Sequence, residues 1–300
     1  MNARDHAQHP RTGLALGLSA YALWGVLPLY FKAISAVAPF DIVAHRVLWS
    51  LPFLALLITV SRSWVKVRSA IGEPRTIAML FVTAVLIGGN WLLYVYAVNG
   101  GHMLAASFGY YLNPLANVLL GRFVLKEKLN RVQWTAVAIA GAGISVLAAG
   151  ALGQLWISLT LCGTFATYGL LRKIVPADAI TGLGIETGIL LPVALLWLAW
   201  RYSAGVPVMG TTPGLTGLLL LAGIVSTTPL LLFTAASRRL PYSTLGMLQF
   251  IAPTLQFLIA IVYGEPLRAA HLVAFPAIWI ALGLYVSALL RAPRLPQPPE

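Results

Sequence analysis

Residues 76–98 read TIAMLFVTAVLIGGNWLLYVYAV, a long run without a single charged side chain. As an α-helix at 1.5 Å per residue, this run would be about 35 Å long, which is enough to cross the ~30 Å hydrocarbon core of a membrane. It does not alternate polar and apolar residues over ten-residue segments, as a membrane β-strand would. The stretch therefore predicts a transmembrane α-helix.

The rest of the chain has the same character. Of its 300 residues, 59% are hydrophobic and 9% are charged, and the mean hydropathy is +0.84. A soluble domain carries roughly 25% charged residues, so lipid is the expected solvent for most of this chain. In lipid each segment must satisfy its own backbone hydrogen bonds, which predicts an all-α integral membrane protein. The ten predicted spans are residues 13–32, 41–60, 76–98, 103–125, 132–150, 152–171, 179–200, 215–236, 242–263 and 269–290.

The net charge of +12 comes from residues in the connections between these spans. This placement argues against a nucleic-acid-binding face, which would gather on one side of a soluble domain. If the N-terminus is cytoplasmic, sixteen Lys and Arg residues fall in cytoplasmic segments and three on the opposite side, with Arg46 inside a span. Basic residues favour the cytoplasmic side of a membrane protein, so both termini are predicted to be cytoplasmic.

The two halves of the chain resemble each other in order. Trp24-Gly25 corresponds to Tyr168-Gly169, and Pro114 corresponds to Pro253. Each half has five spans, an odd number, so a duplicated second half would enter the membrane upside down. Inverted repeats are a recurring design of secondary transporters, with the substrate site near the midplane. The predicted organisation is an N-terminal tail at 1–12, repeats at 13–150 and 151–290 meeting in a tight turn near Gly150, and a disordered C-terminal tail at 291–300.

Several segments are similar to a known family. They are SAYALWGVLPLYFK (19–32), DIVAHRVLWS (41–50), VLIGGNWLLYVYAVN (85–99), GHMLAASFGYYLNPL (101–115) and STLGMLQFIAPTLQFL (243–258). Through them the chain resembles the EamA group of the drug/metabolite transporter superfamily, over about residues 13–290. The resemblance implies a ten-helix transporter of two inverted five-helix repeats in the bacterial inner membrane. Relatives in this group move small metabolites such as amino acids, and the resemblance leaves the cargo of this chain open.

Two charged residues inside predicted spans, Arg46 and Glu186, are the main candidates for binding substrate. Such residues cost roughly 2.5–3.5 kcal/mol at the centre of a span, so they usually face a cavity or a partner. Their estimated depths, from opposite faces, leave an axial gap of about 10 Å. Two separate sites are therefore favoured over an ion pair: Arg46 for an anionic group, and Glu186 for an ammonium group or a proton. The alternatives are snorkelling of Arg46 to the interface and a hydrogen-bonded neutral carboxyl for Glu186.

Polar and aromatic residues inside the spans complete the predicted site. Amide and phenol groups could bind a solute or hold helices together, and the aromatic rings could stack on a solute or pack as ordinary core. These candidates are Asn90, Tyr94, Asn113, Gln249, Trp24, Tyr168, Tyr110 and Trp49. Prolines inside spans kink helices and could serve as hinges or as fixed packing features. They are Pro52, Pro114, Pro192, Pro229 and Pro253.

The predicted function is a secondary transporter or facilitator for a small organic solute, with protons as a candidate coupling ion. The sequence has no P-loop, H-E-x-x-H, nucleophile elbow or dinucleotide fingerprint, so no enzyme activity, cofactor or metal is predicted. Cys162 is the only cysteine, which rules out an intramolecular disulfide. The alternatives are a membrane enzyme acting on a lipid or isoprenoid substrate, and a non-transporting receptor or assembly factor.

Overall fold

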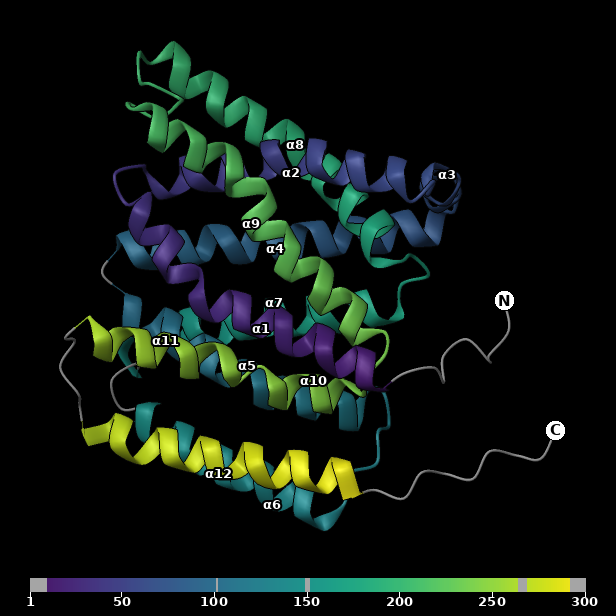
Figure 1. The fold of residues 1–300 in the computed structure, drawn as a ribbon, viewed down its shortest axis with the longest axis vertical. Helices are drawn as coiled ribbons and strands as arrows, with labels where there is room; N and C mark the ends of the chain where they lie inside the picture. The colour runs from purple at the N-terminus through teal and green to yellow at the C-terminus, as the bar shows by residue number, and fades with distance from the viewer. Residues whose placement is uncertain (1–9, 101, 149–151, 264–268, 292–300) are drawn as a thin grey trace.

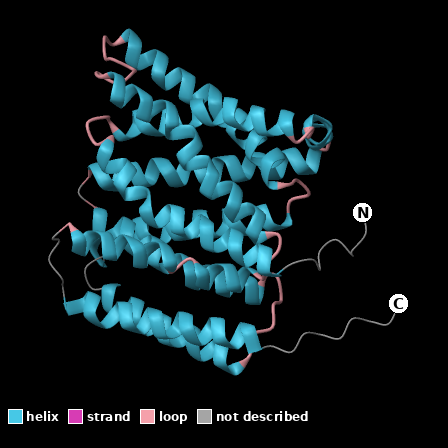
Figure 2. Ribbon diagram, in the orientation of Figure 1, coloured by secondary structure: helices cyan, strands magenta, loops and turns pink. Residues whose placement is uncertain are grey.

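The computed structural model describes residues 10–100, 102–148, 152–263 and 269–291, and all regular structure in these ranges is helical (Figure 2). The predicted tails before residue 10 and after residue 291, and the predicted turn at Gly150, lie outside the described residues. The helices are α1 (Pro10–Ala33), α2 (Pro39–Val60), α3 (Trp64–Gly72), α4 (Pro74–Asn99), α5 (Met103–Phe123), α6 (Arg131–Ala148), α7 (Leu155–Ile174), α8 (Ala179–Ser203), α9 (Pro213–Ser237), α10 (Tyr242–Leu248), α11 (Ile251–Val262) and α12 (Ala269–Arg291), with a 3-10 turn at Leu152–Gln154.

Within the described ranges, 7 helices are long and apolar enough to cross a membrane: α1, α2, α4, α6, α8, α9 and α12. Large apolar side chains lie exposed on the outside of the bundle, including Leu196 and Val262, which are 72% and 84% exposed. Such a surface is unsuited to water and matches lipid tails. The chain is therefore a multi-pass, all-helical membrane protein, as the hydropathy predicted.

The helices form a layered bundle in which segments from both halves of the chain alternate (Figure 1). α2 packs against α8 and α9, α4 against α7 and α8, and α1 against α9 and α11. α5 packs against α7 and α10, and α6 pairs with α12 at one end of the bundle. α1 begins and α12 ends on the same side of the molecule (Figure 1).

Helix boundaries differ from the predicted spans in three places. The short helix α3 was not predicted, because its nine residues are too few and too charged to register as a span. The predicted span 242–263 is two helices: the regular hydrogen-bond pattern breaks at Gln249 and Phe250, which keep right-handed helical dihedrals, and the carbonyl of Gln249 accepts from the N–H of Ala252. α7 extends three residues beyond its predicted end, so Arg172, assigned to a loop from the sequence, lies inside the helix and is fully buried.

The close crossing of α2 and α9 fixes the position of Arg46 along the axis of α2. At this crossing Gly223 of α9 lies against the backbone of Trp49 and Ser50, so closely that a Cβ on Gly223 would overlap these atoms. Thr227 of α9 donates to the Ser50 hydroxyl at 2.6 Å, and Ser50 in turn donates to the carbonyl oxygen of Arg46. Glycine permits this close helix approach, and the hydroxyls lock it one turn from Arg46.

Replacing Gly223 by leucine is expected to separate α2 from α9 and destabilise the protein by at least ~1–3 kcal/mol, the usual cost of overpacking. The measurement is thermal unfolding of purified protein in detergent. Gly217→Leu is the matched control, because Gly217 lies on the same helix and a Cβ there would meet no atom within 4 Å. Equal melting temperatures for the two variants would contradict the close crossing.

Candidate functional site

Arg46 of α2 lies among aromatic residues of four other helices. Its guanidinium lies over the ring of Trp91 of α4, with 3.6 Å between Cζ and the ring centroid. The phenols of Tyr30, Tyr110 and Tyr168 lie within electrostatic range, so helices α1, α4, α5 and α7 surround the charge. Arg46 nevertheless keeps part of its surface exposed, and none of its nitrogen atoms is buried without a partner. The charge is thus held against aromatic rings with part of its surface exposed.

None of the five described carboxylates pairs with Arg46. Asp41 accepts two hydrogen bonds from Arg201, at 3.1 and 2.8 Å, and Glu186 faces Arg172 at 3.4 Å. The remaining three are also placed elsewhere: Asp178 pairs with Lys66, Glu127 accepts from the backbone of Tyr242 and Ser243, and Glu73 is exposed after α3. Within the described ranges, Arg46 therefore has an aromatic partner and no acidic one.

Asn90 and Tyr94 of α4 extend this region toward α5 and α7. The Asn90 amide donates to the Leu161 carbonyl and to Thr164, both at 2.9 Å, and accepts from the Tyr110 hydroxyl at 3.2 Å. The rings of Tyr94 and Tyr110 lie 5.6 Å apart. Asn90 is buried, and its bonds hold three helices together, whereas Tyr94 and Tyr110 are partly exposed. The predicted neighbours Asn90 and Tyr94 thus have different surroundings.

Glu186 of α8 lies in a buried cluster of charge and hydroxyl groups. Its carboxylate accepts from Thr83 at 2.5 Å and from Tyr168 at 3.4 Å. The Nε of Arg172 is 3.4 Å away but makes no directed hydrogen bond, so the contact is an ion pair by distance. Gly182 leaves the space that the guanidinium fills, because a Cβ there would overlap it. The structure therefore pairs Glu186 with Arg172, and no ion pair joins Glu186 to Arg46.

The connection between α7 and α8 extends this cluster outside the spans. Asp178 caps α8 by accepting from the Thr181 N–H at 2.8 Å and pairs with Lys66 at 3.1 Å. Burial alone would raise the pKa of Asp178, but these hydrogen bonds and the ammonium charge outweigh it, so the pKa lies below its ordinary value. The carboxylate stays ionised at neutral pH and holds the start of α8 beside α3.

A second buried network joins α5 to α10. The Asn117 amide donates to Gln249 and its oxygen accepts from the Tyr242 hydroxyl, both at 2.9 Å. Gln249, predicted to face a solute, is 7% exposed and engaged in this network. Asn113, one turn earlier on α5, is fully buried, and neither atom of its amide has a hydrogen-bond partner in the described part of the chain. An unpaired buried amide of this kind typically costs ~1–3 kcal/mol.

The tryptophans named from the sequence lie in two different settings. Trp24 of α1 packs in a cluster of rings, with centroids 5.9 Å from Phe165 and 5.6 Å from Phe233. Trp49 donates to His45 at 3.2 Å, and the other nitrogen of His45 contacts the Val208 carbonyl at 2.5 Å. Both tryptophans keep part of their surface exposed, and the rings of Trp24 and Trp49 do not pack against each other.

Four of the five prolines named from the sequence lie inside helices: Pro52 in α2, Pro114 in α5, Pro192 in α8 and Pro229 in α9. Pro253 instead lies in the first turn of α11, where its missing N–H leaves no helical bond unmade. The helix break precedes Pro253, at Gln249 and Phe250. The helical hydrogen-bond pattern is therefore broken about one turn before Pro253, and the role of this proline as a hinge stays a prediction.

Two polar partners were not anticipated from the sequence. Arg172 precedes Lys173 just after the end of a predicted span, which is typical of a loop. Gly182, on the next helix, leaves the space for the buried side chain of Arg172. The pair of Asp41 and Arg201 joins α2 to α8, and Trp197 donates to the same carboxylate at 2.9 Å. These residues are far apart in the sequence, and nothing in their local pattern links them.

Glu186→Gln is expected to lower the free energy of unfolding by ~3–5 kcal/mol, because it leaves the Arg172 charge buried without an anion. The double variant Arg172→Met/Glu186→Gln should recover most of this loss, since it removes the charge and keeps an oxygen for Thr83 and Tyr168. Thermal unfolding in detergent measures both. Lys66→Gln, which breaks an exposed pair, should change stability by less than ~1 kcal/mol. A double variant as unstable as the single one would contradict the ion pair.

Comparison with known proteins agrees with this architecture. Residues 11–149 match the EamA-like transporter family. The chain is 47% identical over 289 residues to Protein RarD of Escherichia coli, covering 93% of this chain and 95% of that protein. It is 45% identical over 282 residues to an uncharacterized transporter of Vibrio cholerae, covering 93% of each. A crystal structure with 18% identity has a similar fold, with a TM-score of 0.71 over 95% of this chain and 100% of the other. The chain belongs to the RarD proteins of the EamA-like transporter family.

Proposed function

We propose that the protein is a secondary transporter or facilitator that carries a small organic solute with an anionic group across the bacterial inner membrane by alternating access. The observation that carries this proposal is Arg46: a cation inside the bundle, partly exposed, resting on Trp91 and without an acidic partner among the described residues. A guanidinium in this setting attracts a carboxylate or phosphate. The surrounding rings would receive an apolar or aromatic part of the same molecule.

The proposed architecture is ten spans in two inverted repeats, residues 13–150 and 151–290. The helix contacts support it. In the proposed repeat, α1 corresponds to α7, α2 to α8 and α4 to α9. The α1–α9 contact then has the α7–α4 contact as its counterpart, and the α2–α9 contact has the α8–α4 contact. Likewise α5 corresponds to α10 and α11 together, and α6 to α12. The α5–α7 contact then has the contacts of α10 and α11 with α1 as its counterpart, and the α2–α8 and α6–α12 pairs are their own counterparts. An in-plane two-fold axis relating the repeats has this effect.

Both termini are proposed to lie in the cytoplasm. The distribution of basic residues among the connections supports this orientation. Arg172 is buried in α7 and is no longer counted, so fifteen Lys and Arg residues lie on the proposed cytoplasmic side and three on the opposite side. The side that carries the α7–α8 connection and α10 is then the cytoplasmic side. There the buried groups Arg172, Glu186, Tyr242 and Asn117 seal the bundle, while Arg46 remains accessible. The structure would thus represent an outward-facing conformation.

The proposed orientation predicts roles for the remaining polar and aromatic residues and for the prolines. Trp24, Tyr94, Tyr110 and Trp91 would form the walls around a solute bound to Arg46. Asn113 and Gln249 lie on the closed side and would meet the solute after the bundle opens there; the unpaired amide of Asn113 fits a group that finds its partner in another conformation. Pro52, Pro114, Pro192 and Pro229 would bend during this exchange, with the break before Pro253 as an additional hinge.

Arg46→Ala is expected to abolish binding and uptake of the cargo while the protein stays folded. The first step is a thermal-shift screen of purified protein against metabolites paired with their uncharged amides. Carboxylates should stabilise the wild type and their amides should not, and Arg46→Ala should respond to neither. Uptake of the strongest ligand is then measured in proteoliposomes. Arg122→Ala, on the partly exposed end of α5, serves as the control for loss of one positive charge. Normal uptake by Arg46→Ala would refute the assignment.

Glu186 is the proposed proton carrier, because it is the carboxylate inside a span that contacts both a cation and two hydroxyl groups. If its protonation is coupled to transport, uptake by the wild type should depend on an imposed pH gradient, and the Arg172→Met/Glu186→Gln variant should lose that dependence. The double variant is used because its fold is expected to be retained. An unchanged response to the gradient in this variant would eliminate Glu186 as the carrier.

A further inference from the structure

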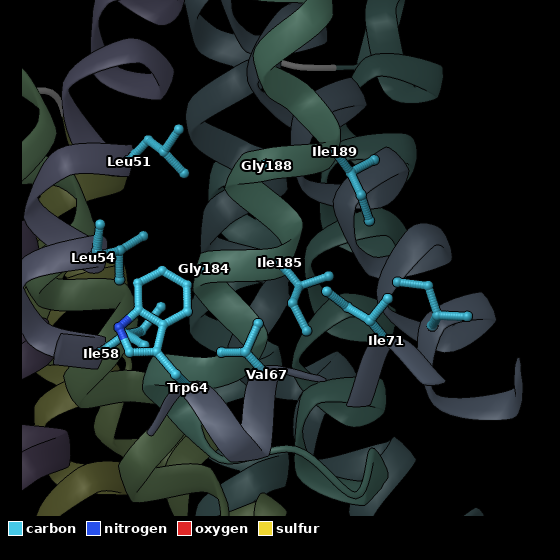
Figure 3. A pocket seen from close by; sticks show the side chains of 12 residues that line it. Leu51, Leu54, Ile58, Trp64, Val67, Ile71, Gly184, Ile185, Gly188 and Ile189 are labelled. Atoms are coloured by element: carbon cyan, nitrogen blue, oxygen red, sulfur yellow. The ribbon is translucent and has the colours of Figure 1, made fainter. Parts of the chain in front are cut away.

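An apolar groove opens between α2, α3, α4 and α8, on the outside of the bundle and apart from Arg46 (Figure 3). It encloses about 340 Å³, and its lining is aliphatic apart from Trp64 and the glycines Gly184 and Gly188. A Cβ added at Gly188 would meet no other atom within 4 Å, so the space above this glycine is open. The lining has no carboxylate, amide or basic side chain to bind a polar solute.

The short helix α3 forms one wall of this groove. Trp64, Val67 and Ile71 recur at helical spacing, and Figure 3 shows them on the groove. Trp64 and Ile71 are 47% and 54% exposed, and the Trp64 indole donates to Thr59 at 3.0 Å. A short helix with an apolar face, basic residues and an exposed tryptophan is typical of the boundary between hydrocarbon and headgroups.

Three arginines lie close in the sequence to residues that line the groove: Arg62 precedes Trp64 by two residues, Arg68 follows it by four, and Arg75 precedes Ile77 by two. Arg62, Arg68 and Arg75 are exposed, and none of them makes an ion pair in the described structure, whereas Lys66 is paired with Asp178. Arg68 follows Trp64 by four residues and so lies on the same face of the helix. Clustered arginines beside an apolar surface attract the phosphate of an anionic lipid, which they can contact with two parallel hydrogen bonds.

We infer that this groove binds an acyl chain of an anionic phospholipid, with the phosphate held by Arg62, Arg68 and Arg75. The apolar lining matches a hydrocarbon tail, and the three exposed arginines that neighbour the lining residues in the sequence match a negative headgroup. The groove joins α2 of the first half to α8 of the second, so a bound lipid would link the two halves on their outer surface. This site is independent of Arg46 and of the transport proposal.

The test compares phosphatidylglycerol with phosphatidylcholine of the same acyl chains, added to delipidated full-length protein in detergent. Phosphatidylglycerol should raise the melting temperature by about 5 °C more than phosphatidylcholine, as expected for a ligand well above its Kd. Native mass spectrometry should show retained phosphatidylglycerol. Gly188→Leu, which fills the groove, and the Arg62→Gln/Arg68→Gln/Arg75→Gln variant should each lose this difference. Gly283→Leu is the matched control, because Gly283 is also an exposed helical glycine with no atom within 4 Å of an added Cβ.

Three results would overturn the inference. Equal effects of the two lipids on the wild type would exclude recognition of the headgroup. Full lipid selectivity in Gly188→Leu would show that the basic residues act without the groove. A dimer of the wild type that Gly188→Leu converts to a monomer would show that a second copy of the chain, and not lipid, occupies the groove.

Discussion

Lipid offers no hydrogen bonds, and this constraint governs every polar group in the bundle. The backbone satisfies it by forming helices, and the side chains must satisfy it by pairing across helices. Asn90 joins α4 to α7, Tyr242 and Asn117 join α10 to α5, and Asp41 joins α2 to α8 through Arg201. These contacts hold together helices that pack mainly through apolar and small residues. A polar group that stays unpaired, or pairs poorly, is correspondingly informative.

Two arginines inside the bundle, Arg172 and Arg46, satisfy this constraint in opposite ways. Arg172 has a carboxylate beside it, two backbone carbonyls within reach and no exposed surface. Arg46 has an aromatic ring, surrounding phenols and an accessible surface. Arg172 is thus fully enclosed by the bundle, whereas Arg46 keeps part of its surface exposed. In the proposed function, this difference between the two arginines corresponds to a closed side and an open side of the bundle.

The helices could be predicted from the sequence because hydropathy is a local property and the lipid constraint leaves few alternatives. The partners of the polar residues could not. Arg172 has the local pattern of a loop residue, and its burial depends on the space left by Gly182 on another helix. Glu186 was recognised as a residue of interest, but its neighbours Thr83, Tyr168 and Arg172 meet only in the folded bundle. Pro253 pointed to the region where the ninth span is interrupted, while the break at Gln249 depends on packing against α5 through Asn117 and Gly246.

The ring of Trp91 beneath Arg46 has a consequence for a carrier that has released its cargo. A bare cation in an apolar bundle costs roughly 2.5–3.5 kcal/mol, and a charge of this kind would hold an empty carrier in place until a new anion arrived. A cation–π contact returns on the order of 0.5–2 kcal/mol of that cost, according to how far the cation is desolvated. In the proposed transport cycle, the ring would stay with the charge and let the unloaded protein reorient without a counter-ion. Trp91 would thereby favour net transport down the available gradient over obligatory one-for-one exchange.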